Sequence, residues 1–240
     1  MIGKPCDIAG IRNLMRQDTR AARLIRLTVA FFCPGVSSLR ISERIVGKYG
    51  LAPDDVKVMR YRGHGCPGAT YIEARDGRVF QQTYDSTWSE ELNQEIQFRC
   101  KVCPDGTGEQ ADIACGDAWV GAGGNPTAEH PGWNAILTRT EIGDRLLQEM
   151  QDAGVVTTAA NRITDLDRVQ PHQVERKRVA LARLVGLALR RQPLPRYRGF
   201  RLAANAWSGR GVVWANLIGT LRRVKRGANR EDLRPDDSGR

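Results

Sequence analysis

The chain has 240 residues, which can bury one good core with an appendage. Its 41% hydrophobic and 27% charged residues are typical of a soluble globular protein. We expect neither a signal peptide nor a membrane span, because the most apolar early segment, 24–32, is short and contains Arg26. Six cysteines without a secretory signal then predict a cytoplasmic protein whose thiols stay free or ligate a metal.

The net charge of +10 is concentrated in the C-terminal third. Residues 160–226 contain 16 Lys and Arg but only 3 Asp and Glu, so the remaining chain is slightly acidic. A basic region can meet nucleic acid, a membrane surface or an acidic partner. Because these cations are mostly Arg spaced among Leu, Val and Ala, we expect amphipathic helices with a solvated face.

The first predicted elements each adjoin a cysteine. An apolar stripe from Ile8 to Met15 predicts a helix with Cys6 just before it, where the helix dipole favours a thiolate. Residues 24–32 are predicted to form a buried strand that ends at Cys33. A cysteine at a strand end commonly faces a site, whereas Cys6 could equally be a small buried thiol.

A glycine-rich segment follows the next two elements. Residues 37–49 are expected to be helical, and residues 56–61 to form a strand that leads into R-G-H-G-C-P-G at 62–68. Accessible backbone amides and the Arg62 cation suit a phosphate or a flat anionic ligand, and a plain hairpin loop is the alternative. Alternating residues on both sides of Asp76-Gly77 predict a β-hairpin.

Cys100 and Cys103 begin the densest motif of the chain, C-K-V-C-P-D-G-T-G-E-Q-A-D-I-A-C-G-D-A-W. Their spacing lets both sulfurs turn toward one metal or cluster. Taken alone, the pair could be a zinc knuckle, half of an iron–sulfur site or a redox dithiol.

The remaining elements are mostly helical. A strand is predicted over 132–140, and Thr140 is expected to cap a helix over 141–153. Two basic helices are predicted over 173–191 and 206–226. The predicted fold is therefore α/β or α+β, a mixed β-sheet with flanking helices.

Five segments, in order, resemble one family: G-K-P-C-D-I-A-G-I-R, F-F-C-P-G-V-S-S, Y-R-G-H-G-C-P-G, the motif that begins at Cys100, and G-W-N-A-I-L-T-R-T. This family is the beta subunit of coenzyme F-420 hydrogenases and dehydrogenases, which includes the 7-hydroxymethyl chlorophyll a reductases. The resemblance implies an oxidoreductase with FAD and iron–sulfur clusters. Such proteins pass electrons between a reduced partner and a deazaflavin or another organic acceptor.

The resemblance also implies a set of cluster ligands. The family's cysteines fall on Cys6, Cys33, Cys100 and Cys103, and four thiolates are what a [4Fe-4S] cluster needs. Cys66 and Cys115 stand where Trp and Ser are more usual in the family. We expect packed thiols there, with a swapped ligand as the alternative.

Three segments would line the flavin and substrate region that the resemblance implies. The cofactor-binding residues are Arg62, Gly63, Gly65, Gly68, Gly116, Asp117, Trp119, Asn134 and Arg139. Backbone amides and Arg62 can contact phosphate or a flavin edge, and Trp119 offers a stacking face or packs in the core. His64 is expected to be an exposed loop residue, and no catalytic residue is assigned.

Family members carry a further N-terminal portion before the G-x-P-C segment, whereas Met1 stands four residues before Pro5. The chain therefore resembles the C-terminal half of a longer protein, and we expect FAD binding and turnover to need the other half. Either that half or an electron-transfer protein is the expected partner. The predicted parts are a family domain over 1–158, a basic helical extension over 159–226 and a disordered tail over 227–240.

Two other functions compete with the iron–sulfur flavoprotein. A non-catalytic module could hold zinc or another metal on the same four cysteines. A basic nucleic-acid-binding protein is ranked last, because we expect its C-terminal part to lack the surface aromatics of single-strand binders.

Overall fold

The computed structural model of the chain describes residues 1–118, 129 and 132–230. The chain divides into two compact units. The first combines Met1–Glu95 with Asp105–Val174, and the second combines Ile96–Pro104 with Glu175–Arg240. Mixed sheets and flanking helices confirm the predicted α/β class. Within the described residues, no helix is long and apolar enough to cross a bilayer.

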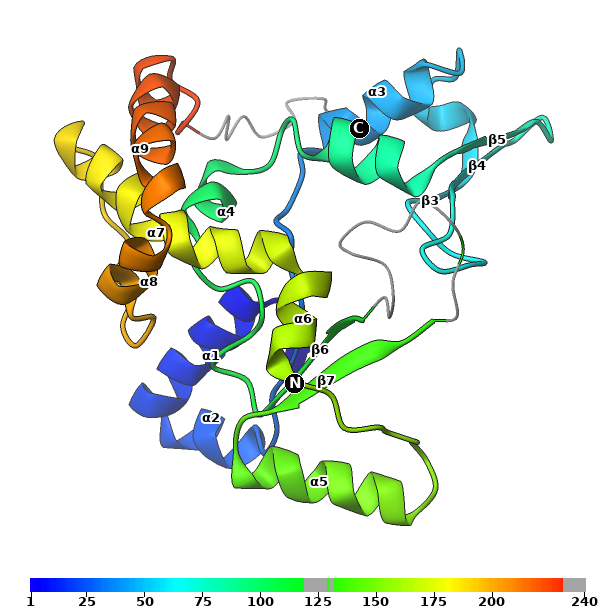
Figure 1. Cartoon of the computed structure of the whole chain (residues 1–240). Helices are drawn as coiled ribbons and strands as arrows, with labels where there is room; N and C mark the ends of the chain where they lie inside the picture. The colour runs from blue at the N-terminus through cyan, green and yellow to red at the C-terminus, as the bar shows by residue number, and fades with distance from the viewer. Residues whose placement is uncertain (119–128, 130–131, 231–240) are drawn as a thin grey trace. The chain divides into compact units, whose positions relative to one another are not determined.

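A four-stranded sheet organises the first unit (Figure 1). Its strands, in spatial order, are β1 (Ile2–Gly3), β2 (Val29–Phe31), β6 (Ile113–Asp117) and β7 (Asn134–Thr138). The first three are parallel and β7 runs antiparallel to β6. Parallel pairing needs a crossover, and α1 (Pro5–Gln17) and α2 (Thr19–Leu24) supply it between β1 and β2. The small core under α1 contains Ile8, Ala30, Ala111 and Ala114.

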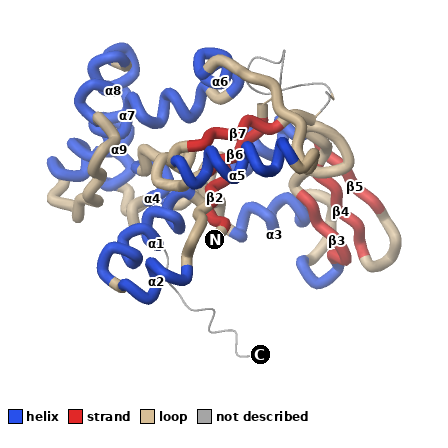
Figure 2. Tube along the Cα trace, turned by 90° about the horizontal axis from the view of Figure 1, so that it is seen from below, coloured by secondary structure: helices blue, strands red, loops and turns tan. Residues whose placement is uncertain are grey.

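A three-stranded antiparallel sheet forms a second, separate part of the same unit. Figure 2 shows β3 (Val56–Arg60), β4 (Thr70–Ala74) and β5 (Val79–Gln82) side by side, with α3 (Leu39–Gly47) next to them. Ile41 and Ile45 of α3 pack on Ile72 of β4 and on Leu92 of the π-helix η2 (Ser86–Leu92). A 3₁₀ turn, η1 (Pro53–Asp55), precedes β3.

Several turns follow the predicted local chemistry. Gly77 has φ +88° between β4 and β5, as the predicted hairpin requires. The hydroxyl of Thr140 accepts a hydrogen bond from the N–H of Gly143 and caps α5 (Glu141–Asp152). α6 (Ile163–Val169) and the first turn of α7 (Pro171–Leu189) complete the first unit.

One predicted strand is shorter than expected and begins later. The Asp18 carboxylate accepts hydrogen bonds from the N–H groups of Arg20 and Ala21, at 2.7 and 3.4 Å, and so begins α2. Leu24 therefore ends a helix and is 72% exposed, and only 29–31 of the predicted segment 24–32 form a strand. A cap outweighs the apolar pattern here because it satisfies two backbone donors.

The second unit contains α4 (Phe98–Val102), most of α7, α8 (Leu202–Ser208) and α9 (Arg210–Lys225). A Cβ built on Gly186 of α7 would lie 3.0 Å from Cβ of Thr220, so α7 and α9 cross closely at small residues. The helix predicted over 206–226 is two helices, because α8 ends before Gly209. Residues 227–230 form a turn, and the rest of the predicted tail lies outside the described residues.

Two tryptophans of the second unit are on the surface. Trp207 is 71% exposed and Trp214 is 70% exposed. The expectation that this basic part lacks surface aromatics is therefore wrong. Helical periodicity did not reveal it, since an exposed and a buried Trp contribute alike to an apolar stripe.

Candidate functional site

The carboxyl ends of the parallel strands bring several predicted site residues to one edge of the four-stranded sheet. Gly3 pairs with Ala30 and Phe31 pairs with Cys115, so β1, β2 and β6 end side by side. Chain segments that leave such an edge commonly form the ligand site of an open parallel sheet. Cys6 follows β1, Cys33 follows β2 and Asp117 ends β6.

Cys6 lies in the first turn of α1 and is exposed. The preceding Lys4 donates its backbone N–H to Asp7 at 3.0 Å and forms an ion pair with the same carboxylate at 2.7 Å. The hydrogen bond to Asp7 raises the pKa of Lys4, and the charges of Asp7, Cys6 and Cys33 add to this rise. One ammonium group thus lies near both thiols.

A turn anchored by a buried carboxylate holds Cys33. The N–H of Cys33 donates to the Gly106 carbonyl at 2.8 Å. Asp105 accepts hydrogen bonds from the N–H groups of Thr107, Gly108 and Glu109. Burial raises the pKa of Asp105, and this effect outweighs the lowering by these hydrogen bonds. Gly108 has φ +68°, and a Cβ there would lie 2.4 Å from Ala30, so glycine lets the turn pack on β2.

Cys100 and Cys103 lie in the second unit, in and just after α4. The N–H of Cys103 bonds to the Cys100 carbonyl at 3.4 Å, which closes a tight turn between the two cysteines. Both side chains are half-buried and neither is in a disulfide. We call the segment Cys100–Cys103 the knuckle.

The four predicted cluster cysteines fall into two pairs, one in each unit. Cys6 and Cys33 in the first unit, and Cys100 and Cys103 in the second, are free and at least partly exposed thiols, which are the donors that an iron–sulfur cluster needs. Among the described residues, no three or more His, Cys, Asp or Glu side chains are gathered as a metal site. Convergence of all four sulfurs on one centre therefore stays a prediction.

The other two cysteines differ from these four. Cys115 lies inside β6, opposite Phe31 and Ile136, and burial raises the pKa of its thiol. A raised pKa disfavours the thiolate form that ligates iron. Cys66 lies in the glycine-rich loop, where its N–H donates to Glu129 at 2.5 Å.

An ion pair joins two predicted cofactor-binding segments. The Arg62 guanidinium donates to both carboxylate oxygens of Asp117, at 2.6 and 3.4 Å. Burial lowers the pKa of Arg62, but the hydrogen bond and charge of Asp117 outweigh it and raise the pKa overall. Arg62 also lies 5.7 Å from the ring of Tyr84, whose pKa burial raises to about 12. The cation expected to meet a phosphate is thus already paired with a carboxylate.

The amides of the glycine-rich loop are also engaged. Glu129 accepts hydrogen bonds from the N–H groups of Cys66 and Gly68, at 2.5 and 3.1 Å, and its carboxylate lies against Gly65. The loop therefore binds an oxyanion, and its present occupant is a side chain of the same protein.

Gly68 should be sensitive to substitution. It has φ +74°, and a Cβ there would lie 2.7 Å from the Gly63 carbonyl oxygen. We expect Gly68→Ala to lower the free energy of unfolding by about 1–3 kcal/mol, from backbone strain and the clash. Chemical denaturation should show the loss, while Gly47→Ala, in a helix with open space around Gly47, should be neutral or stabilising. An unchanged Gly68→Ala protein would contradict the strained loop.

The remaining predicted cofactor residues are not all brought together. Asn134 pairs with Asp117 at the carboxyl edge, whereas Arg139 follows the opposite end of β7. There the Arg139 N–H bonds to the Asp112 carbonyl at 2.9 Å, and its guanidinium bonds to the Thr107 carbonyl at 3.2 Å. A Cβ on Gly116 would lie 2.2 Å from the Phe32 ring, so Gly116 serves close packing. Trp119 lies outside the described residues.

A protein-family comparison decides the relationship of the chain. The model of the family described as the C terminus of the coenzyme F420 hydrogenase/dehydrogenase beta subunit matches residues 1–163. The chain belongs to this family.

Individual relatives agree with this assignment. The coenzyme F420 hydrogenase subunit beta of Methanococcus voltae is 29% identical over 183 residues, which cover 74% of this chain and 58% of the relative. The protein of the same name from Methanothermobacter thermautotrophicus is 26% identical over 161 residues, 64% of this chain and 50% of the relative. The chain thus spans about half the length of the curated relatives it matches.

A solved structure shares the fold of this family member. It is a chain of the F420-reducing [NiFe] hydrogenase complex from Methanosarcina barkeri, studied by xenon derivatization. The TM-score is 0.50 at 19% identity, over 81% of this chain and 63% of that one.

Sequence reasoning missed several residues that shape the site of this family member. Lys4 stands two positions before Cys6, and this short spacing could have indicated a cation close to the thiol. Neither Glu129 nor Asp112 could be recognised from local sequence. The partners of Glu129 lie more than sixty positions away, and Thr28 and Arg12, two partners of Asp112, lie more than eighty positions away.

Proposed function

We propose that the chain is an iron–sulfur flavoprotein oxidoreductase subunit or domain. In this proposal Cys6, Cys33, Cys100 and Cys103 hold a [4Fe-4S] cluster, and electrons pass between the cluster, FAD and a deazaflavin or another organic acceptor. The supporting observation is that adjacent parallel strands place Cys6 and Cys33 at one edge, with one ammonium group near both. Membership of a family named for coenzyme F420 enzymes supports the redox class.

The chain's own residues would bind and orient the cofactors. A bound cluster supplies one-electron transfer, and a bound flavin couples it to hydride transfer. Lys4 would offset the negative charge of the thiolates beside it, and Asp7 fixes the ammonium group in place. The Arg62–Asp117 pair and the amides of Cys66 and Gly68 would orient the flavin or the acceptor at the same edge.

A partner protein is part of the proposal. The relatives are named as subunits of hydrogenases, and one similar chain belongs to a hydrogenase complex. The exposed Trp207 and Trp214 on the basic second unit suit an acidic electron-transfer protein, since Trp and Arg are the side chains that dominate protein interfaces. Alternatively, the partner supplies the remainder of the flavin pocket.

Anaerobic purification after expression with iron tests the proposal. We expect a brown protein with about four iron and four sulfide per chain. FAD should bind once the partner portion of a family member is supplied in trans. A colourless protein with stoichiometric zinc would overturn the redox assignment and favour the metal-binding module.

A further inference from the structure

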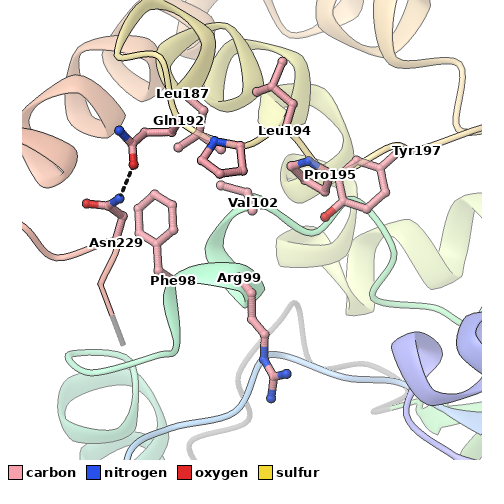
Figure 3. A pocket seen from close by; sticks show the side chains of 10 residues that line it. Phe98, Arg99, Val102, Leu187, Gln192, Leu194, Pro195, Tyr197 and Asn229 are labelled. Atoms are coloured by element: carbon pink, nitrogen blue, oxygen red, sulfur yellow. Dashed lines mark hydrogen bonds between the residues drawn. The ribbon is translucent and has the colours of Figure 1, made fainter. Parts of the chain in front are cut away.

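The knuckle belongs to the second unit, together with the C-terminal helices. Phe98 and Val102, on either side of Cys100, line a pocket with the end of α7 and the segment after it (Figure 3). The opposite wall contains Leu187 and Leu194. α4, and the cysteine on it, thus faces the end of α7 and the following segment across this pocket.

One arginine of α7 holds the peptide between the two cysteines. The Arg183 guanidinium donates to the carbonyl of Lys101, at the centre of the knuckle. Its Nε and second terminal nitrogen both donate to Asn216 Oδ1 of α9, at 3.0 and 2.8 Å. The Asn216 amide in turn donates to the Val212 carbonyl at 3.0 Å, so the guanidinium is fixed on both sides.

Positive charge around this arginine is poorly balanced. Residues 96–104 and 175–230 contain 17 Lys and Arg and one acidic residue, Glu175. Burial lowers the pKa of Arg183 to about 10, and the positive charges of Arg223 and Arg176 act in the same direction. The negative charge of Glu175 acts in the opposite direction but is outweighed. Half-buried like charges are costly unless an anion offsets them.

We infer that Arg183 is a positioning residue for the knuckle, and that its guanidinium, bonded to the peptide between the two cysteines, supplies positive charge that stabilises an anionic thiolate centre at Cys100 and Cys103. Arg183 lies beyond residue 163, where the family match ends. The inference rests on the proposed function, because the thiolate centre is the proposed cluster. It adds that the extension tunes the cluster: a cation at the knuckle favours the reduced, more negative state and raises its reduction potential.

The positioning role can be tested without any metal. Hydrogen exchange of the metal-free full chain should show the Cys103 amide exchanging about tenfold faster in Arg183→Met, the factor expected for one charge-assisted hydrogen bond. Arg190→Met is the matched control, because Arg190 is exposed and directly follows the last residue of α7. Unchanged exchange in Arg183→Met would overturn the positioning role. If that variant fails to fold, Asn216→Ser provides the same test, since it removes the amide oxygen that fixes Arg183, together with the amide's own bond to the Val212 carbonyl.

The electrostatic role is tested on the reconstituted protein by redox titration. Arg183→Met, which removes the charge, should shift the potential to more negative values. Arg183→Lys, which keeps a charge at this position, should keep the potential and loosen the knuckle. An unchanged potential in Arg183→Met would overturn this role. Absence of iron in the wild-type protein would instead overturn the proposed function. The exchange experiment would still test whether Arg183 positions the knuckle.

Discussion

Cys33→Ser is expected to reduce bound iron to background after anaerobic reconstitution. Serine keeps the size of the side chain but replaces the soft thiolate that iron–sulfur chemistry requires with a poorly ionised hydroxyl. The two backbone hydrogen bonds of Cys33, to Gly106 and from Gln173, do not involve its sulfur, so the fold should survive. Iron and sulfide assays, together with the visible absorption, measure the result.

Cys115→Ser is the matched control for this experiment. Cys115 pairs with Phe31 at the same edge of the sheet and is likewise half-buried, but its thiol is disfavoured as an anion. We expect this variant to keep its iron. Full iron in Cys33→Ser would remove Cys33 from the ligand set, and loss of iron in Cys115→Ser would identify Cys115 as a swapped ligand.

Asp112→Ala is expected to lower the free energy of unfolding by about 3–5 kcal/mol, the range for breaking a buried ion pair. The side chain of Asp112 is 5% exposed and bonds to Arg12 of α1 at 2.6 Å. It also accepts from the N–H and hydroxyl of Thr28, before β2, and from the hydroxyl of Thr140, before α5. Urea unfolding should show the loss, whereas Asp152→Ala, at the exposed end of α5, should change it by less than about 0.5 kcal/mol.

The same carboxylate gives stability a defined dependence on pH. Burial raises the pKa of Asp112, but the hydrogen bonds from Thr140, Thr28 and Arg12 outweigh it, so the pKa in the folded state is lowered. Its contribution is therefore full above the pKa of an unfolded Asp, about 3.9, and is lost as pH falls through the lower folded value. The difference in stability between wild type and Asp112→Asn should accordingly be large at pH 7 and shrink below pH about 4. A difference that stays constant with pH would contradict this account.

Local chemistry explains which elements the sequence predicts well. The hairpin at Asp76-Gly77 and the Thr140 cap depend on neighbouring residues, and both are confirmed. The strand predicted over 24–32 forms only at 29–31, and its first residue, Leu24, belongs to the helix that the Asp18 side chain begins. The association of residues 96–104 with the C-terminal helices depends on contacts across about eighty positions, which no local pattern contains.

Motifs were sufficient to predict the position of two candidate ligands in the fold. The family motifs select Cys6 and Cys33, and the structure places both at one edge of the sheet. Strand direction was not predictable, so Asn134 and Arg139, five positions apart in one motif, were grouped although they flank opposite ends of β7. The ion pair between Arg62 and Asp117 was also missed. Both residues were predicted to line one pocket, and the sequence does not show that two such residues bond to each other.

Any anionic ligand of the glycine-rich loop must first displace the carboxylate of Glu129. Because this carboxylate belongs to the same chain, its effective concentration at the Cys66 and Gly68 amides is high, and it competes with any free anion for them. A weak, singly charged ion would lose that competition, whereas a multiply charged phosphoester with further contacts could win it. We therefore expect the loop to bind only anions that make further contacts elsewhere, and to exclude small inorganic anions.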